Sequence, residues 1–328
     1  MIFGLLAGAF FACGEEEKTA TEEVVTTCAT TIKETNPGSG AADFYILDDI
    51  VVEFADEEDA TATVTLLDAS GAEVAGSTSV DGYDVTFSPD AALMPSSNYT
   101  ISISYCNDGG SPVEIGFTTS GLGEALSGSV AGKTYAVNIA SGTFVKPAGV
   151  GDLIGGAFNN NILIGILDDS NGELQVEGAI SLEGSLEQDV CTETLVFPEA
   201  ADFSDAPYFE IPEGDLTLSI AGITATIYDL NISGMFAADG SYFGGGQLRG
   251  NLDARDLVDV IAELVEVESA DDICGLVAGF GVACEPCADG ANYCLGVEVV
   301  DLVADVVEGT TLVSVTSQDI ADNPDCAQ

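Results

Sequence analysis

The stretch VTFSPDAALMPSSNYTISIS, residues 85–104, decides the fold of the first part of the chain. In YTISISY (99–105) an apolar residue recurs at every second position, which is the pattern of a strand with one buried face. YDVTFSP (83–89) is a second β-rich run, and PSSN (95–98) is a turn signal ahead of the later strand. The stretch therefore predicts two neighbouring strands of a β-domain.

The same organisation extends outward from this stretch. IVVEF (50–54) and TVTLLD (63–68) precede it, and VEIGFTT (113–119) follows it. The connecting DASGAE, VDG and NDGGSP are rich in Gly, Asp, Asn and Pro, as turns are. Short strands at this spacing predict a β-sandwich over residues 37–121.

The order of these pieces resembles a bacterial Ig-like domain of the type found in surface-layer proteins and many exported lipoproteins. The matching residues are Thr86, Phe87, Ser88, Pro89, Leu93, Pro95, Tyr99, Thr100 and Phe117–Thr119. The resemblance covers about a quarter of the chain. It implies a spacer or interaction module without catalytic residues, and fold-level likeness implies no ligand.

Residues 122–328 predict a larger β-rich domain, reached through a short hinge at Gly121–Leu126. The predicted strands are KTYAVNI, NILIGILD, ELQVEGAISLE, DLTLSIA, ITATIYDLNISGMF, YFGGGQLRGNL and NYCLGVEVVDLVA. The fold class is therefore mainly β: an Ig-like β-sandwich followed by a larger antiparallel β-sheet or partial barrel. A helical pair at about 254–280 accompanies this sheet.

The period changes to that of a helix near residue 253. The apolar positions of LDARDLVDVIAELVEV recur at helical spacing, with Asp253 where an N-cap belongs. The apolar residues are Leu257, Val260, Ile261, Leu264 and Val265. A second short helix is predicted at about 271–279.

Composition excludes several functions. Six Lys and Arg stand against 56 Asp and Glu, a formal net charge of −50. Such a chain cannot neutralise a nucleic-acid backbone or bind anionic lipid electrostatically. It has no His, which excludes imidazole-based triads and His-ligated zinc. The charge is typical of a protein adapted to a salty or divalent-rich medium, where screening weakens the self-repulsion.

The first residues predict an export signal. Ile2–Ala12 is an apolar run of eleven residues, too short for a spanning helix, which needs about 20. Residues 1–12 followed by Cys13 resemble a bacterial lipoprotein signal peptide, and residues 13–36 predict an acidic tether. This resemblance implies acylation of Cys13 and anchoring to the outer membrane through lipid. The alternative is plain secretion with an incidental Cys13.

Eight further cysteines predict disulfide bonds, because an even number of cysteines in an exported chain is typical of pairing in disulfides. They are Cys28, Cys106, Cys191, Cys274, Cys284, Cys287, Cys294 and Cys326. Cys28 and Cys106 stand apart from the rest and predict one bond. The cluster at 271–294 leaves two alternatives open, a four-cysteine zinc site and a redox pair in CEPC (284–287).

Two small groups of residues could bind a ligand. Arg249 and Arg255 could hold an acidic ligand, or they could form structural ion pairs, with Asp253 or Asp229 as the partner of Arg255. The turn DDSNGE could bind Ca²⁺ through four residues, although it is also a strong hairpin signal. Those residues are Asp168, Asp169, Asn171 and Glu173.

These observations predict a structural or binding role at the cell envelope, without catalysis and without a required cofactor. Besides a redox or metal role of the Cys284–Cys287 pair, two alternatives stay open: a carrier that holds an apolar ligand in the second domain, and a hydrolase based on two carboxylates.

Overall fold

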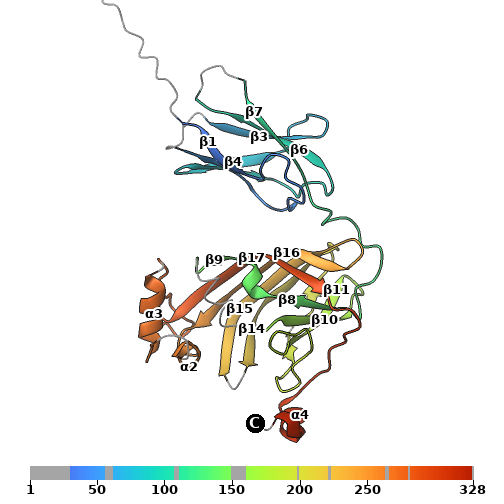
Figure 1. Cartoon of the computed structure of the whole chain (residues 1–328), viewed down its shortest axis with the longest axis vertical. Coiled ribbons are helices and arrows are strands. Elements are labelled where there is room, and N and C mark those ends of the chain that lie inside the picture. The colour runs from blue at the N-terminus through green and yellow to red at the C-terminus, as the bar shows by residue number, and fades with distance from the viewer. Residues whose placement is uncertain are drawn as a thin grey trace, which may run out of the picture.

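The computed structural model describes residues 30–55, 62–106, 111–148, 160–197, 199–220, 223–262, 266–279 and 281–326. The chain is mainly β and forms a small sandwich and a larger barrel (Figure 1). The prediction of a mainly β fold is therefore confirmed.

The first domain is a sandwich of two antiparallel sheets. One sheet has the order β1 (Ile32–Asn36), β2 (Ile50–Phe54), β5 (Asp84–Pro89) and β4 (Gly76–Asp81). The other has the order β3 (Thr63–Asp68), β6 (Asn98–Ser104) and β7 (Val113–Thr118). The alternating residues of YTISIS point inward as expected, since Tyr99, Ile101 and Ile103 are buried. Strands β2, β3, β5, β6 and β7 lie where the sequence predicts them.

The sequence pattern does not predict two strands of the sandwich, β1 and β4. β1 lies inside the range 13–36 that the sequence predicts as a tether, so that prediction is wrong at Ile32–Asn36. β1 is an edge strand of IKETN whose side chains are mostly exposed, and it is identified only by its pairing with β2. β4 is exposed along its whole length, so its sequence GSTSVD has no buried face to give a period.

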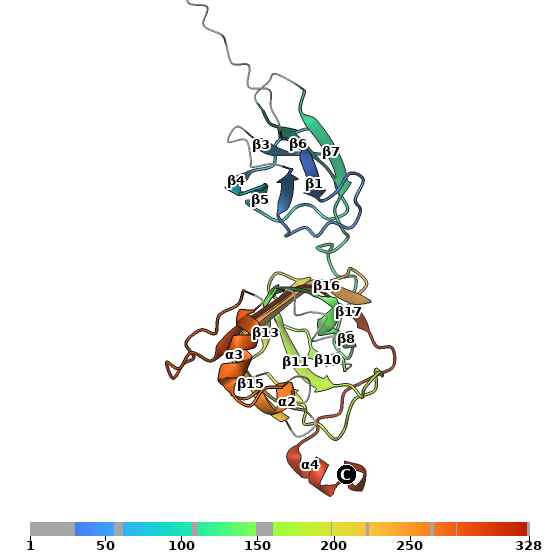
Figure 2. The ribbon, with the colours of Figure 1, turned by 60° about the vertical axis from the view of Figure 1, so that its left-hand side comes forward.

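The second domain is a closed barrel, where the sequence predicted a sheet or partial barrel. Its eight strands each pair antiparallel with the next along the chain, and the last pairs with the first (Figure 2). They are β8 (Thr134–Val137), β10 (Ile162–Asp168), β11 (Glu173–Ile180), β13 (Ala201–Asp202), β14 (Tyr208–Ile220), β15 (Ile223–Phe236), β16 (Tyr242–Asp253) and β17 (Cys294–Val306). The short β9 (Thr143–Lys146) joins β17, and β12 (Leu195–Val196) joins β11.

Aromatic side chains fill one part of the barrel interior. Five rings stack edge to face or tilted, with neighbouring centroids 5.0 to 5.9 Å apart. They belong to Tyr135, Phe203, Phe209, Phe236 and Phe243. The buried hydroxyl of Tyr135 donates to the carbonyl of Gly240 at 2.9 Å, so burial leaves no orphan donor there. The interior is thus a packed core.

A helical pair forms a small core of its own beside the barrel (Figures 1 and 2). α3 (Ala270–Ala278) lies where a helix is expected, and the Ser269 side chain caps it by accepting from the N–H of Asp272. α2 (Val258–Ala262) begins later than predicted, because Asp253 ends β16 and binds Arg255 instead of capping a helix. The predicted Leu264 and Val265 lie outside the described residues.

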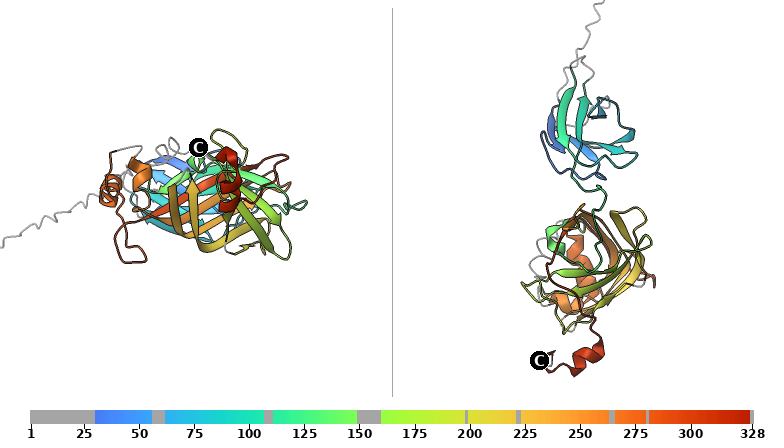
Figure 3. Two further views of the ribbon diagram at one scale, coloured as in Figure 1. Left: turned by 90° about the horizontal axis from the view of Figure 1, so that it is seen from below. Right: turned by 90° about the vertical axis from the view of Figure 1, so that its right-hand side faces the viewer.

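After β17 the C-terminal segment leaves the barrel wall and ends on the side of the barrel away from the sandwich (Figure 3). It forms α4 (Ser317–Asp322) and a short 3-10 turn, Pro324–Cys326. Thr316 and Asp319 form a capping box at the start of α4. In the part of the chain that the structure describes, no helix has the length and apolar character to cross a membrane.

The predicted hinge at Gly121–Leu126 has one buried residue, Leu122, while Gly121, Glu124 and Ala125 are exposed. Leu122 is buried in the sandwich core, which also includes Met235 from the barrel. The two domains also approach each other at Gly245, whose φ is +57°. A Cβ added there would lie 2.1 Å from Cζ of Tyr45. The Tyr45 ring therefore sits directly on the barrel backbone, and only glycine accommodates it.

We predict that Gly245→Ala destabilises the protein and loosens the contact between the domains. A left-handed backbone costs a non-glycine residue about 1–2 kcal/mol, and the overlap with Tyr45 adds to this cost. Gly184→Ala is the matched control, because Gly184 has φ +65° with nothing within 4 Å of the added Cβ. Calorimetric unfolding and limited proteolysis of the linker measure both effects. Equal losses in the two variants would contradict the packing of Tyr45 on Gly245.

Candidate functional site

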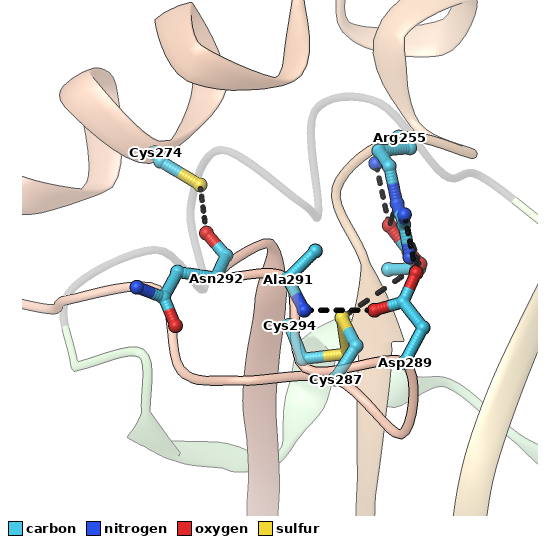
Figure 4. A network of polar contacts seen from close by, with 8 residues as sticks. Arg255, Cys274, Cys287, Asp289, Ala291, Asn292 and Cys294 are labelled. Carbon is cyan, nitrogen blue, oxygen red and sulfur yellow. Dashed lines mark hydrogen bonds and ion pairs between the residues drawn. A yellow bond between two sulfur atoms is a disulfide. The ribbon is translucent and has the colours of Figure 1, made fainter.

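Arg255 lies in a network of carboxylates at the end of β16 (Figure 4). Its Nε donates to both carboxylate oxygens of Asp253, at 2.9 and 3.0 Å. Its Nη1 donates to Asp289 Oδ2 at 2.7 Å, and its guanidinium carbon lies 5.5 Å from the ring centre of Tyr293. The predicted ion pair between Arg255 and Asp253 is present, and Asp229 takes no part in it. Arg255 holds the turn after β16 to the loop that carries Asp289.

The charges in this network stabilise one another. Hydrogen bonds from Arg255 lower the pKa of Asp253, whose side chain is only 7% exposed. The hydrogen bond from the backbone N–H of Ala291 lowers the pKa of Asp289 most, and the hydrogen bond from Arg255 lowers it further. A buried carboxylate beside a guanidinium keeps its charge only while the partner is there. The arrangement therefore uses Arg255 to fix a turn and leaves it engaged with its own carboxylates.

The clustered cysteines are paired. Cys274 bonds to Cys284 and Cys287 bonds to Cys294, while Cys191 bonds to Cys326 at the C-terminal end. The predicted disulfide bonds are therefore present. Cys106 is also disulfide-bonded, and Cys28, its predicted partner, lies outside the described residues.

The disulfide pairing bears on the two alternatives for the cluster. The two cysteines of CEPC belong to different disulfides, so they do not form a redox pair with each other. A zinc site needs thiolates, and here all four sulfurs are in disulfides. Asp253, Cys287 and Cys294 do have ligand atoms within 4.8 Å of one another, but both sulfurs of this group are bonded to each other.

Arg249 is held separately from Arg255. Its Nε lies 3.2 Å from Glu298, its cross-strand neighbour on β17, and its Nη2 donates to Gln247 at 3.1 Å. Lys146 on β9 approaches the same Glu298 at 3.4 Å. The structure thus gives the two arginines different carboxylate partners, and the acidic-ligand pocket proposed from their proximity in sequence is not formed by them together.

The predicted calcium turn is a hairpin between β10 and β11. Asn171 and Gly172 have φ of +62° and +77°, as the Asn-Gly signal requires. Burial raises the pKa of Asp169, but hydrogen bonds from Ser129 and two backbone N–H groups outweigh this and lower it. The oxygens of Asp168, Asp169 and Glu173 do not gather within 4.8 Å among the described residues. Calcium binding there stays a prediction.

The barrel interior tests the carrier alternative. A cavity of about 20 Å³ lies beside the aromatic core, lined by Val137, Ile164, Phe243, Leu248 and Leu302 among others. This volume holds about one water molecule. Pockets for small molecules are typically some 300–1,000 Å³, so this cavity is too small for an apolar ligand.

The sequence pattern missed one carboxylate. Asp48 lies on the sandwich in a turn where its N–H donates to the carbonyl of Tyr45, and it faces Asp301 of the barrel. Burial, together with the charges of Asp301 and Asp49, raises the pKa of Asp48 to about 6. No local signal marks it, because its neighbour Asp301 comes from β17 and is brought close only by domain packing.

We predict that Arg255→Met shifts acid unfolding to higher pH. In the native protein the lowered pKa of Asp253 contributes stability that is present above the unfolded pKa and lost as pH falls through the folded one. Without Arg255 that contribution disappears, and the buried carboxylate loses its partner. Acid titration followed by circular dichroism measures the shift. Arg249→Met is the comparison, since Glu298 keeps Lys146 as a partner, and an equal shift in both variants would contradict a specific role for Asp253.

We predict the opposite pH dependence for Asp48→Asn. Because the pKa of Asp48 is raised, the folded state binds more protons than the unfolded state between about pH 4 and 6. The stability of the native protein therefore falls as the pH rises from about 4 to 6. Asp48→Asn removes that fall and is more stable than the native protein at pH 7, by roughly 1 kcal/mol after allowance for solvent screening. Urea unfolding at pH 4 and pH 7 measures both proteins. A difference that does not change with pH would contradict the prediction.

Some known proteins and one protein family resemble a part of this chain. No curated protein matches it. Among solved structures, CopC from Methylosinus trichosporium OB3b is 15% identical, with 28% of this chain and 93% of that chain covered and a TM-score of 0.24. PcoC, a methionine-rich copper resistance protein from Escherichia coli, is 17% identical, with coverages of 28% and 98% and a TM-score of 0.24.

A third solved structure resembles a larger share of this chain. A cycloalternan-forming enzyme from Listeria monocytogenes is 11% identical, with 64% of this chain but only 20% of that chain covered, at a TM-score of 0.17. Scores this low carry no functional argument for any of the three.

The family comparison is specific to the first domain. Residues 26–119 match the family described as bacterial Ig-like domain. This range contains the seven strands of the sandwich, from β1 to β7. The first domain of this chain is therefore a bacterial Ig-like domain.

Proposed function

We propose that this protein is a lipid-anchored protein of the cell envelope, in which an Ig-like domain and a solid barrel form a structural or binding unit without catalysis. The observation that carries the proposal is the packed barrel interior. Five aromatic rings occupy it and the adjoining cavity measures about 20 Å³, so contacts with other molecules fall to the outer surface.

The disulfides support an exported location. Cys191–Cys326, Cys274–Cys284 and Cys287–Cys294 persist in oxidising compartments and are rare in the cytosol. The net charge of −50 supports a location rich in salt or divalent cations, since screening reduces self-repulsion there. Both features agree with export, and lipid attachment at Cys13 would hold the protein at the outer membrane.

The two alternatives have different support. The carrier alternative needs a ligand-sized interior cavity, and the cavity beside the aromatic core of the described residues, about 20 Å³, is too small for this. The hydrolase alternative has one observation in its favour, because a carboxyl with a raised pKa, Asp48, faces a second carboxylate, Asp301. Asp48 is half-buried against the barrel, so we favour the structural or binding role.

We predict that Cys13→Ser moves the protein from the membrane fraction to the soluble fraction. Acyl chains on Cys13 supply the anchor, and the acidic surface has no electrostatic attraction for anionic lipid. Fractionation, with mass spectrometry of the N-terminal peptide, measures anchoring. Cys28→Ser is the control and keeps the membrane location, because only Cys13 lies at the end of the apolar leader. A native protein without a fatty-acid mass on Cys13 would overturn the anchoring proposal.

A further inference from the structure

Strand β4 forms an open edge of the sandwich. In the described part of the chain it pairs with β5 on one side and with no strand on the other. All of its residues, 76–81, are exposed to solvent. Such an edge is a template for pairing with another chain, because its outer N–H and C=O groups lack a partner strand.

The ladder with β5 determines which backbone groups of β4 point outward. Just before the pair of Gly76 with Pro89, the N–H of Asp90 donates to the carbonyl of Ala75 at 3.0 Å. In an antiparallel ladder, residue pairs that exchange hydrogen bonds alternate with pairs that do not, and this register is continuous from residue 76 to residue 81. The N–H and C=O groups of residues 76, 78 and 80 therefore point away from β5 and form the open edge.

The centre of this edge lacks the usual protection against pairing. Natural edge strands are protected by charged side chains, Pro or β-bulges. Residues 76–80 read GSTSV, without charge or Pro, in a chain that has 56 acidic residues. β1, at the opposite edge of the same sheet, carries Lys33 and Glu34 and has an irregular register with β2. In the other sheet β7 carries Glu114, and a bridge between Leu67 and Glu73 covers part of β3.

The sequence of β4 is complementary to itself in the antiparallel direction. If two copies pair with Thr78 opposite Thr78, the outward backbone groups of Gly76 in each copy meet those of Val80 in the other. The polar side chains then face one another as Thr with Thr and Ser with Ser, which are favourable cross-strand pairs. Asp81 falls opposite Ala75, so no two carboxylates are directly opposite.

We propose that β4 pairs with β4 of a second copy of this chain, antiparallel and centred on Thr78. The four-stranded sheets of two sandwiches then join into one sheet, and the open edge of each is covered by the other. The interface is isologous, because the same strand supplies both halves of it. Main-chain hydrogen bonds along the edge supply the affinity of this mode of association.

The same register covers an exposed valine. Val80 is 47% exposed, and in the dimer it lies opposite Gly76 of the other copy. The ring of Phe87 reaches Gly76, because a Cβ added there would lie 2.5 Å from the Cζ of Phe87. Val80 of each copy therefore packs beside Phe87 of the other, as a β-branched residue does against an aromatic ring on neighbouring strands.

Net charge sets the conditions under which the pairing is observed. Each copy carries a formal charge of −50, so two copies repel each other at low salt. At about 1 M salt the Debye length falls to about 3 Å, which screens this repulsion. Self-association through β4 therefore strengthens as salt rises, whereas association between complementary charges weakens. The pairing rests on the proposed structural or binding role and gives that role a partner, a second copy of the chain.

Sedimentation equilibrium tests the pairing with the purified full chain, which carries Cys13→Ser so that acyl chains cannot drive association. Concentrations run from about 5 to about 500 µM, at about 0.1 M and about 1 M NaCl. A reversible equilibrium of monomer and dimer is expected, with a dissociation constant about tenfold lower at the higher salt concentration.

Position 78 faces itself in this register, which permits a charge-swap test. Thr78→Asp places two carboxylates directly opposite each other and weakens self-association about tenfold. Mixing Thr78→Asp with Thr78→Lys places opposite charges there, and the mixture associates about tenfold more tightly than Thr78→Asp alone. Thr63→Asp is the control and leaves association unchanged, because Thr63 is exposed on β3 of the other sheet. Circular dichroism checks that each variant is folded.

The pairing of β4 is overturned by any of three results. These are a monomer at every protein and salt concentration, equal weakening by Thr78→Asp and Thr63→Asp, and a mixture of the two Thr78 variants that associates no more tightly than Thr78→Asp alone. None of them bears on acylation of Cys13. A native protein that lacks the acyl group would overturn the anchoring proposal and leave the result for β4 standing.

Discussion

Strand β17 pairs with β16 over most of its length and with β8 near its end, and the second pairing closes the barrel. Closure matters because each strand of an antiparallel sheet has one face to bury, and a closed sheet buries that face against itself. It also gives partners to the first and last strands, which would otherwise be exposed edges. The aromatic core, the domain contact and the position of the helical pair all depend on this closed wall.

The filled interior directs function to the outside of the molecule. In a barrel of eight strands the interior is just wide enough for side chains to fill or for one small ligand. Here the rings of Tyr135, Phe236 and Phe243 and their neighbours take that space. The outer wall then offers the contact with the Ig-like domain and the small core of α2 and α3.

Basic residues are scarce, and each one in the described part of the chain has a structural partner. With six Lys and Arg against 56 Asp and Glu, a guanidinium near any part of the chain meets a carboxylate. Arg255 is shared by Asp253 and Asp289, and Arg249 shares Glu298 with Lys146. Sequence reasoning identified Asp253 as a possible partner of Arg255 because it is two residues away. It could not find Asp289, which is brought in by the loop between the paired cysteines.

Local patterns in the sequence determined much of this protein: the strands with one buried face, the Asn-Gly hairpin, helix α3 and the Ig-like character of the first domain. These features depend on neighbouring residues, so their physical cause lies within a few positions of the chain. Tertiary structure alone decided the strands β1 and β4, the closure of the barrel, the cysteine pairing, the Tyr45 contact at Gly245 and the raised pKa of Asp48. Each of these features depends on residues that are far apart in sequence. Which of those residues come into contact is determined only when the buried faces of the strands pack against one another.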